Sequence, residues 1–237
     1  MKKKNKNFSE FKKVLKIEKI LGIYFSDKLP KKFRYYKNAA ACVLLSYAFN
    51  SREAIVFDSK KYHQTCSGAD FFLKFKKFSK KEISDIYTKK EHVFKNNLAC
   101  KKFLKLLPEL SKEIKGKSII LKQMDNINEK PGIVMLLVIP AQAGRILGLL
   151  NFSSYKEVEI FPSQPTCISL FAPITNSKPH INFIDYYDRY YQGKQSDRYL
   201  WSENEMIISL SFDDFKKILE NVHKSPHGSF KIEDANM

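Results

Sequence analysis

Three cysteines of this chain stand where a thiol can take part in chemistry. Cys66 is followed by Ser67 and Gly68, a small turn whose free backbone N–H groups can point at a thiolate or an anion. Cys167 follows a Pro-Thr step typical of a helix start, and Cys42 follows three alanines that let another backbone or a bulky cofactor approach. Thiolates in such settings are metal ligands or nucleophiles. The candidate metal ligands are Cys42, Cys66 and Cys167, the candidate catalytic thiol is Cys66, and the candidate cofactor-binding turn is Cys66, Ser67 and Gly68.

The spacing of the cysteines narrows the kind of site that they can form. No CxxC or CxxxC pair occurs, so a local zinc-finger or ferredoxin-type motif is excluded and any metal site must join distant parts of the chain. Three thiolates can hold an iron–sulfur cluster with one iron open, or a soft metal ion, and they can also act as a redox or nucleophilic pair. Ordinary buried cysteines are the plain alternative. Cys100 lies among lysines in a predicted helix and is left out of the site.

The segment 185–201 is a second dense feature, with five tyrosines, Trp201, Arg189 and Arg198. Arginines among aromatic rings can grip a carboxylate or a phosphate, or stack on bases, so Arg189 joins the candidate cofactor-binding residues. The alternative is a solvent-facing loop that its tyrosines anchor to the core. No Gly-rich phosphate loop, GxSxG elbow or HExxH helix is present, so the sequence predicts no reaction class and does not decide whether the protein is an enzyme.

The chain is strongly basic, with 42 Lys and Arg against 25 Asp and Glu and a formal net charge of +17 at pH 7. Such a charge attracts nucleic acid, phosphorylated ligands and anionic surfaces. Lysines are spread along the whole chain instead of forming one arginine-rich stripe, which favours a compositional bias with the ammonium groups on solvated faces. A nucleic-acid-binding module that uses the scattered lysines and the segment 185–201 is the alternative function.

Length and composition predict one large core. With 237 residues and 43% hydrophobic content the chain can bury a single domain, and no Ser-, Gly- or Pro-rich linker divides it. We expect a basic tail and the start of the first helix over 1–12, and a polar tail over 223–237. Between them we expect one domain over 13–222, made of two packed halves at about 13–115 and 116–222.

Nothing in the sequence predicts export or a membrane span. The N-terminus is charged and is followed by mixed helix, not by the apolar run of a signal peptide. The longest apolar run, 133–141, is well short of the roughly 20 residues that span a bilayer. Four cysteines in such a chain are reduced thiols or metal ligands, and we expect a cytoplasmic protein. The expected ligand is a small molecule or a metal cofactor, and the expected function is to bind a metal, an iron–sulfur cluster or a thiol-reactive cofactor between the two halves. No oligomeric state is predicted.

Hydrophobic periodicity predicts an α/β fold in which strands and helices alternate. Phe8, Phe11 and Leu15 recur at helical spacing and predict an amphipathic first helix that packs on the core, with a membrane-surface helix as the alternative. Segment 133–139 is apolar on both faces, as expected of a strand that is covered on both sides. The predicted strands are 22–26, 54–58, 118–123, 133–139, 158–161 and 207–210. The predicted helices are 38–49, 80–86, 96–107, 141–150 and 212–222.

The two halves carry a weak internal repeat. The order strand, helix, strand and Thr-Cys step occurs once up to Cys66 and again up to Cys167, with similar intervals from the end of the helix. We therefore expect two pseudo-repeated β-α-β units that share a mixed sheet flanked by helices, with the two Thr-Cys steps related by a pseudo-twofold axis. Coincidence is the alternative, because strand-helix-strand order is common.

The linear order of these features resembles a prokaryotic family catalogued only as domain of unknown function 169. The matching stretches are 22–26, 41–48, the Cys66-Ser67-Gly68-Ala69 turn, the apolar strand to Pro140 with the helix after it, Cys167 with Pro173, and Asp188-Arg189 before Glu205. The resemblance implies a free-standing cytoplasmic protein in which Cys42, Cys66 and Cys167 belong to a family pattern, and it implies no established activity. This chain departs from the family in its lysine excess and in having Asn50-Ser51-Arg52 where a glycine is expected.

Overall fold

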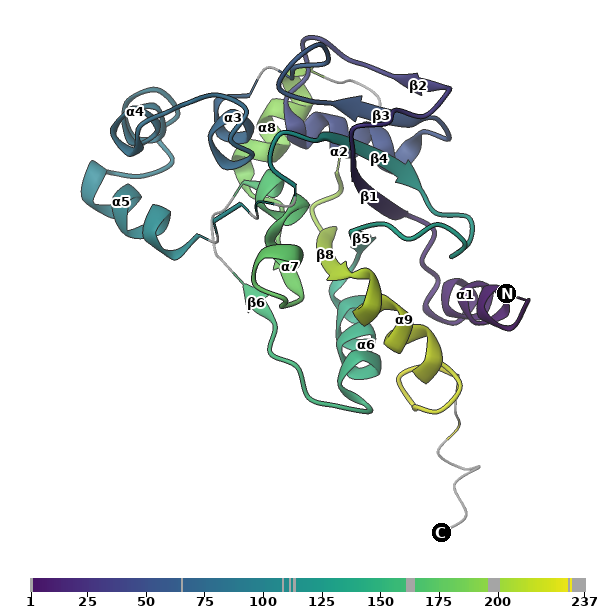
Figure 1. Ribbon diagram of the computed structural model, residues 1–237. Coiled ribbons are helices and arrows are strands. Elements are labelled where there is room, and N and C mark those ends of the chain that lie inside the picture. Colours follow the sequence, from purple (N-terminus) through teal and green to yellow (C-terminus); the bar gives the residue numbers. More distant parts are fainter. Residues whose placement is uncertain are drawn as a thin grey trace.

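The computed structural model describes residues 2–64, 66–107, 109–110, 112, 114–160, 165–195, 201–229 and 231. Figure 1 shows the arrangement of the elements. The strands are β1 Ile20–Ser26, β2 Phe33–Arg34, β3 Ala54–Phe57, β4 Ser118–Gln123, β5 Ile133–Val138, β6 Glu159–Ile160, β7 His180–Asn182 and β8 Met206–Ser211. The helices are α1 Lys2–Leu15, α2 Ala41–Asn50, α3 Ser67–Phe72, α4 Lys80–Asp85, α5 Asn97–Leu106, α6 Pro140–Asn151, α7 Ala172–Thr175, α8 Tyr186–Gln195 and α9 Phe212–Asn221. A π-helix η1, Ile86–Lys90, follows α4, and a 3₁₀ helix η2, Thr166–Leu170, precedes α7.

The strands form one eight-stranded mixed sheet in the order β2-β3-β4-β1-β5-β8-β7-β6. Strand β1 pairs antiparallel with both β4 and β5, and Leu21 lies opposite Met135 in the β1–β5 pair. Strands from before and after residue 115 thus meet in this central pair and continue as one sheet. The predicted α/β class, with a mixed sheet flanked by helices, is confirmed.

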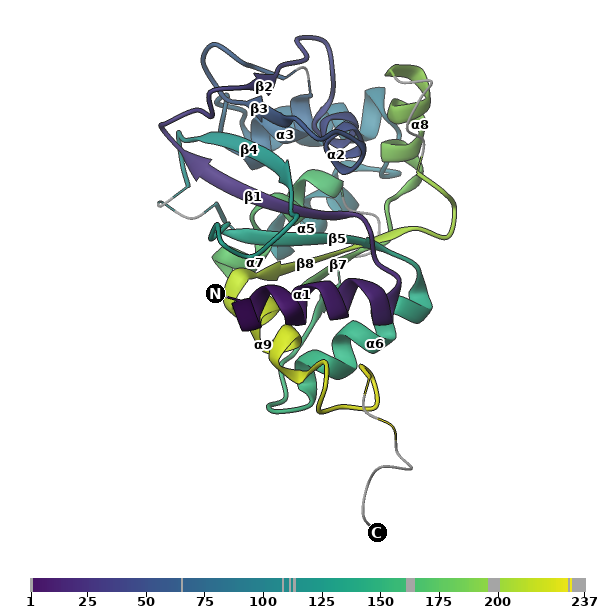
Figure 2. The ribbon, with the colours of Figure 1, turned by 90° about the vertical axis from the view of Figure 1, so that its right-hand side faces the viewer.

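Alternating side chains of the central strands supply a separate core on each face of the sheet. In β5, Met135 packs into a core beneath α2, α3 and η2, whereas Val134 packs into a second core with α1, α6 and α9. All six residues of β5 are buried, because helices cover both faces of this strand. Figure 2 shows α1, α6 and α9 on one side of the central strands and α2 and α3 on the other.

The first helix belongs to the second of these cores. Phe8 and Phe11 are buried and meet the ring of Phe215 on α9 in edge-to-face contacts, with ring centroids 6.1 and 5.5 Å apart. The prediction that this amphipathic helix packs on the core is therefore confirmed. The helix begins at Lys2 and so includes most of the range 1–12, over which a basic tail and the start of the first helix were expected.

The predicted internal repeat is not confirmed in the form expected from the sequence. Strands β1 and β3 are not neighbours, because β4 lies between them and pairs antiparallel with each. The parallel neighbours are instead β2 with β3, joined through α2, and β6 with β7, joined through η2 and α7. In this arrangement Cys167 corresponds to Cys42 and not to Cys66. Thr65, half of the first Thr-Cys step, lies outside the described residues.

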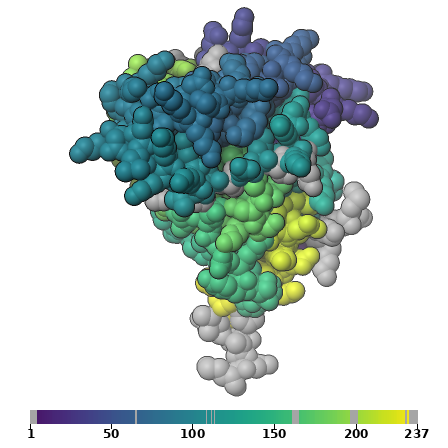
Figure 3. Space-filling view, turned by 60° about the vertical axis from the view of Figure 1, so that its left-hand side comes forward, coloured from purple at the N-terminus to yellow at the C-terminus, as the bar shows by residue number. Residues whose placement is uncertain are grey.

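Helices α4, η1 and α5 form an extension at one side of the sheet (Figure 1). A capping box closes the start of α4, since Ser79 accepts from the Glu82 backbone N–H and Glu82 accepts from that of Ser79. Asn96 caps α5 by accepting a hydrogen bond from the Ala99 N–H. In the space-filling view of Figure 3 this blue-to-teal extension forms the upper part of the face, and Tyr87, Phe94 and Phe103 from it line the cavity that contains the cysteines. The extension thereby covers one side of the region that contains the cysteines.

In the part of the chain that the structure describes, no helix is both long enough and apolar enough to cross a membrane.

Candidate functional site

Cys42 is the second residue of α2 and lies on its buried face. The small side chains of Ala39, Ala40 and Ala41 are all buried, which lets this helix start come close to its neighbours. The Ala40 backbone N–H donates to the Gln195 side chain of α8 at 2.8 Å, so α2 and α8 are joined at this end. Cys42 is 4% exposed and its thiol donates a hydrogen bond to the Asp188 carboxylate of α8.

Cys66 caps the start of α3. Its sulfur accepts a hydrogen bond from the Ala69 backbone N–H at 3.5 Å, in the manner of an N-cap side chain. Gly68 lies in the same turn, where an added Cβ atom would be 2.8 Å from the Tyr87 hydroxyl oxygen. Only glycine therefore fits between the Cys66 turn and the Tyr87 ring as both stand.

A buried carboxylate fixes the chain leading into this turn. Asp70 on α3 accepts from the Gln64 side chain at 2.9 Å, and the same amide also donates to the Cys66 carbonyl at 3.2 Å. The His63 ring nitrogen Nε2 lies 2.6 Å from Asp70 Oδ1, the same oxygen that accepts from Gln64, and Lys76 Nζ lies 2.9 Å from Asp70 Oδ2. His63 is thus bonded to Asp70 and helps to position the Cys66 turn.

Cys167 is the second residue of η2 and is 3% exposed. The residue before it, Thr166, donates its backbone N–H to Asp188 Oδ2 at 2.5 Å and also donates its hydroxyl to the same oxygen. Asp188 is thus bonded to the starts of both η2 and α2, the two helices that carry Cys167 and Cys42. This single carboxylate holds the two cysteine-bearing helix starts together.

All three predicted cysteines line one cavity of about 130 Å³. The helices α2, α3 and α8, which contribute to its walls, all lie in the upper part of the molecule in Figure 2. The cavity is also lined by the other two residues of the predicted Cys66 turn, Ser67 and Gly68. The rest of its wall contains the acidic and aromatic residues Tyr87, Glu91, Phe94, Phe103, Asp185, Tyr187, Asp188 and Tyr191, together with Ala40, Ala41, Val93, Pro165 and Gln195. The structure therefore brings together cysteines that are up to 125 positions apart in the sequence.

Burial sets the protonation of the thiols. It raises the pKa of Cys42 and of Cys167, and the neighbouring Asp188 carboxylate and other cysteines raise both further. Burial also raises the pKa of Cys66 to about 11, although the Ala69 N–H partly offsets the rise. At neutral pH the three sulfurs are therefore thiols and not thiolates.

The acidic wall is likewise held toward its neutral form. Burial, and next the nearby Asp185 carboxylate, raise the pKa of Asp188 to about 7. Burial also raises the pKa of Asp185 and of Glu91. Among the described residues that line the cavity there is no Lys, Arg or His. In a chain of net charge +17, the described wall of this cavity therefore carries acids and no basic side chain.

Tyr87 brings an unpartnered hydroxyl to the cavity. Its side chain is 3% exposed, and its oxygen has no hydrogen-bond partner among the described residues. An unsatisfied buried hydroxyl costs about 1–3 kcal/mol, so this group is positioned for a partner that the protein itself does not provide.

The arrangement of the cysteines bears on metal binding and on which thiols belong to the site. Within the described ranges, no three His, Cys, Asp or Glu side chains are arranged as they stand to hold a metal ion. Cys100 is fully buried in α5 and does not line the cavity, in agreement with its omission from the predicted site.

Arg189 is placed away from the cavity wall. Its guanidinium donates to four backbone carbonyls, those of Ile184 and Glu205 at 3.1 Å each, Trp201 at 3.1 Å and Ser202 at 2.6 Å. The structure therefore does not bring this predicted cofactor-binding residue to Cys66. Of the Tyr/Arg segment 185–201, the stretch up to Gln195 is described, and Arg198 lies outside the described residues.

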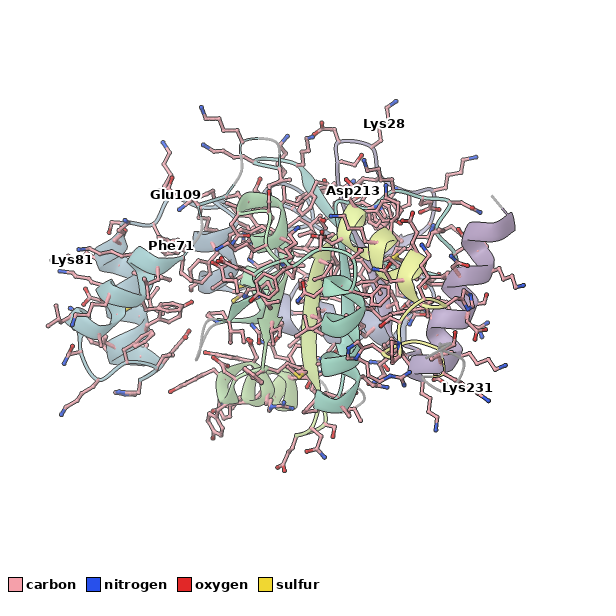
Figure 4. All side chains as sticks on the ribbon, turned by 90° about the horizontal axis from the view of Figure 1, so that it is seen from below. Lys28, Phe71, Lys81, Glu109, Asp213 and Lys231 are labelled. Atoms are coloured by element: carbon pink, nitrogen blue, oxygen red, sulfur yellow. The ribbon has the colours of Figure 1, made fainter. Side chains whose placement is uncertain are left out.

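Lys28, Lys81 and Lys231 are exposed and lie on different sides of the molecule in Figure 4. Nucleic-acid binding through the scattered lysines stays a prediction.

The sequence analysis did not select Tyr87 or the acidic residues Glu91, Asp185 and Asp188 as site residues. Asp188 stands in the centre of the Tyr-Tyr-Asp-Arg-Tyr-Tyr run, and an acid flanked by rings on a helix is a signal for a buried carboxylate. Tyr87 and Glu91 gave no comparable signal, because their place in the wall depends on the π-helix η1.

The comparisons with known proteins agree with the resemblance noted from the cysteine pattern. No curated protein and no solved structure matches the chain. A family model, DUF169, described as an uncharacterised ArCR family, matches residues 10–221 and so includes all the elements that build the cavity. The chain therefore belongs to the DUF169 family.

Proposed function

We propose that Cys42, Cys66 and Cys167 bind a metal centre through three thiolates, and that this centre is an iron–sulfur cluster. The observation that carries the proposal is that thiols from three separate elements line a single cavity. Cysteine thiolates are the usual ligands of iron–sulfur clusters and of soft metal ions. With three protein thiolates, a four-iron cluster has one iron to which a small molecule can bind.

The charge of the wall supports a ligand role for the cysteines. A nucleophilic cysteine needs a lowered pKa, whereas burial and nearby acids raise the pKa of all three thiols here. A metal cation displaces the thiol proton on binding and relieves the repulsion between neighbouring anions. The same wall therefore disfavours a free thiolate and favours a metal-bound one.

The size of the cavity supports a cluster over one ion. A cavity of roughly 10–15 Å³ is enough for a single water. The volume of about 130 Å³ beside the three sulfurs is several times larger. A group of several atoms makes better use of this space than a single metal ion.

The proposal is tested by purifying the full chain without oxygen and reconstituting it with iron and sulfide. Absorbance near 400 nm, iron, acid-labile sulfide, zinc and copper are then measured for the wild type and for C42S, C66S and C167S. The matched control is C100S, because Cys100 is buried as completely but lies outside the cavity wall.

The expected result is a cluster in the wild type and in C100S, and a strong loss in each of the other three variants. If the protein instead binds a single zinc or copper ion and each of the three cysteines is needed for it, the proposed ligands stand and the proposed iron–sulfur cluster is wrong. A protein without bound metal under all loading conditions would overturn the whole proposal.

A further inference from the structure

The cavity wall has a composition that matches a second kind of ligand group. Besides the sulfurs it contains three carboxyl groups, on Glu91, Asp185 and Asp188, and no positive side chain among the described residues. The chain carries a net charge of +17, yet none of its described basic side chains lies in this wall to neutralise the carboxyl groups. The positive charge that this wall suits is therefore one brought by the ligand.

Aromatic rings stand beside the acids in the less buried part of the cavity. Phe94, Tyr187 and Tyr191 are half-buried, as are Glu91 and Asp185, whereas Cys42 and Cys167 are almost fully buried. Tyr191 donates its hydroxyl to Glu91 Oε1 at 3.4 Å, so a ring and a carboxylate are held next to each other. Rings with adjacent carboxylates are the surroundings in which proteins bind organic ammonium groups, through cation–π attraction and charge.

The unpartnered Tyr87 hydroxyl is an independent sign of a ligand in the same cavity. It is 3% exposed, lies beside Gly68 and has no partner among the described residues. A phenol can both donate and accept a hydrogen bond, so a polar group of a bound molecule would satisfy it.

We infer that the cavity binds a small organic ammonium compound, with its cationic group between Glu91, Asp185 and Tyr191 and its other end directed toward Tyr87. The ammonium site deepens the proposed function, because it names the class of ligand that the same cavity binds. It rests on the proposed function only for the metal at the inner end of the cavity. Recognition of the cation itself uses no metal.

The test is calorimetric binding of choline and of its neutral isostere 3,3-dimethylbutan-1-ol to the reconstituted protein. Choline is expected to bind at least about tenfold more tightly, because the neutral compound gains no charge or cation–π attraction. E91Q is expected to lower choline affinity about tenfold, and Y191L by a similar factor, whereas Y191F keeps the ring and has a small effect. The matched control is E157Q, since Glu157 is exposed on the surface in an ion pair with Lys178 and lies outside the cavity.

Equal binding of the two compounds, or no binding of either, would overturn the inference. A loss of affinity in E157Q as large as in E91Q would also overturn it, because the effect would then come from overall charge. Thermal melting shows whether each variant is folded. If E91Q does not fold, the comparison of choline affinity between Y191L and Y191F tests the inference.

Metal content is measured on the same samples, so the two proposals fail separately. Choline binding by a protein that never takes up metal supports the ammonium site and contradicts the cluster. A loaded protein that shows no preference for choline contradicts the ammonium site alone.

Discussion

Thr166 gives both its backbone N–H, at 2.5 Å, and its hydroxyl to one carboxylate oxygen of Asp188. The Cys42 thiol donates to the same carboxyl group, so one side chain of α8 connects two cysteine-bearing helices. The Cys42 contact crosses from one half of the chain to the other, whereas both Thr166 contacts lie within the second half.

Replacement of Asp188 is expected to weaken metal binding without removing a ligand. D188A takes away the group that orients Cys42 and Thr166, and loss of such a partner typically lowers metal affinity about 10–100-fold. D188N retains an acceptor for Thr166 and is expected to lose less. Competition with a chelator measures the affinities. Equal affinity in the wild type and D188A would contradict the orienting role.

Removal of the Tyr87 hydroxyl is expected to stabilise the ligand-free protein. In Y87F a buried oxygen without a partner disappears, which recovers about 1 kcal/mol of unfolding free energy. The same change is expected to weaken choline binding. Urea unfolding and calorimetry check the two effects. A less stable Y87F would show that the hydroxyl has a partner in the folded protein.

A methyl group at Gly68 is expected to collide with that hydroxyl. The added Cβ atom would lie 2.8 Å from the Tyr87 oxygen, and the next contact is the Cys66 sulfur at 3.6 Å. G68A should therefore lower the unfolding free energy by about 1–3 kcal/mol.

The G68A/Y87F double variant tests the cause of this loss. Phenylalanine removes the colliding oxygen, so most of the stability is expected to return, which a double-mutant cycle from urea unfolding measures. Additive effects of the two changes would place the strain elsewhere.

The elements that the sequence predicted well are the long ones with strong hydrophobic patterns. Strands β4 and β5 and helices α5 and α9 lie close to their predicted ranges. The short strands β2 and β7 were missed, because β7 contains the polar pair His180 and Asn182 and is recognisable only through its pairing with β6 and β8. The insertion of β4 between β1 and β3 depends on contacts between distant segments, which a local pattern does not contain.

For the site, the small residues around each cysteine were enough to select three thiols that line one cavity. Arg189 was selected because arginines beside rings often bind ligands, and the structure uses its fork-shaped donors on backbone carbonyls instead. A single sequence does not distinguish these two uses of arginine.

Arg189 is accordingly expected to affect stability and not nucleic-acid binding. R189K replaces a planar fork by one ammonium group that cannot reach four carbonyls, so the unfolding free energy should fall by about 3 kcal/mol. Urea unfolding and a salt-dependent DNA-binding assay measure the two properties. A stable R189K that has lost salt-dependent binding would favour the nucleic-acid function.

The buried His180 is expected to make the protein less stable in acid. Burial lowers the pKa of His180 to about 4, against about 6.5 in an unfolded chain. Below pH 6.5 the His180 imidazole is protonated in the unfolded state but stays neutral in the folded state, so the unfolding free energy falls as the pH drops toward 4. The loss approaches about 3 kcal/mol, and no contribution of this kind exists above pH 6.5.

H180N tests this dependence. Asparagine places a polar atom near the position from which His180 Nδ1 contacts Ser169 at 3.2 Å, but it does not titrate. Urea unfolding at pH 7 and pH 4.5 should show a smaller acid-induced loss for H180N than for the wild type. Identical losses would assign the acid sensitivity to other groups.

The cavity is built like a dimer interface, in that both halves of one polypeptide contribute residues to it. Cys42 and Cys167 each occupy the second residue of the helix that joins two parallel edge strands, one in each half. The next helix after each unit contributes Cys66 in the first half and Asp188 in the second. Neither half alone supplies all four of these residues. Three of the four places carry sulfur and the fourth carries a carboxylate, which gives the cavity one chemically distinct side.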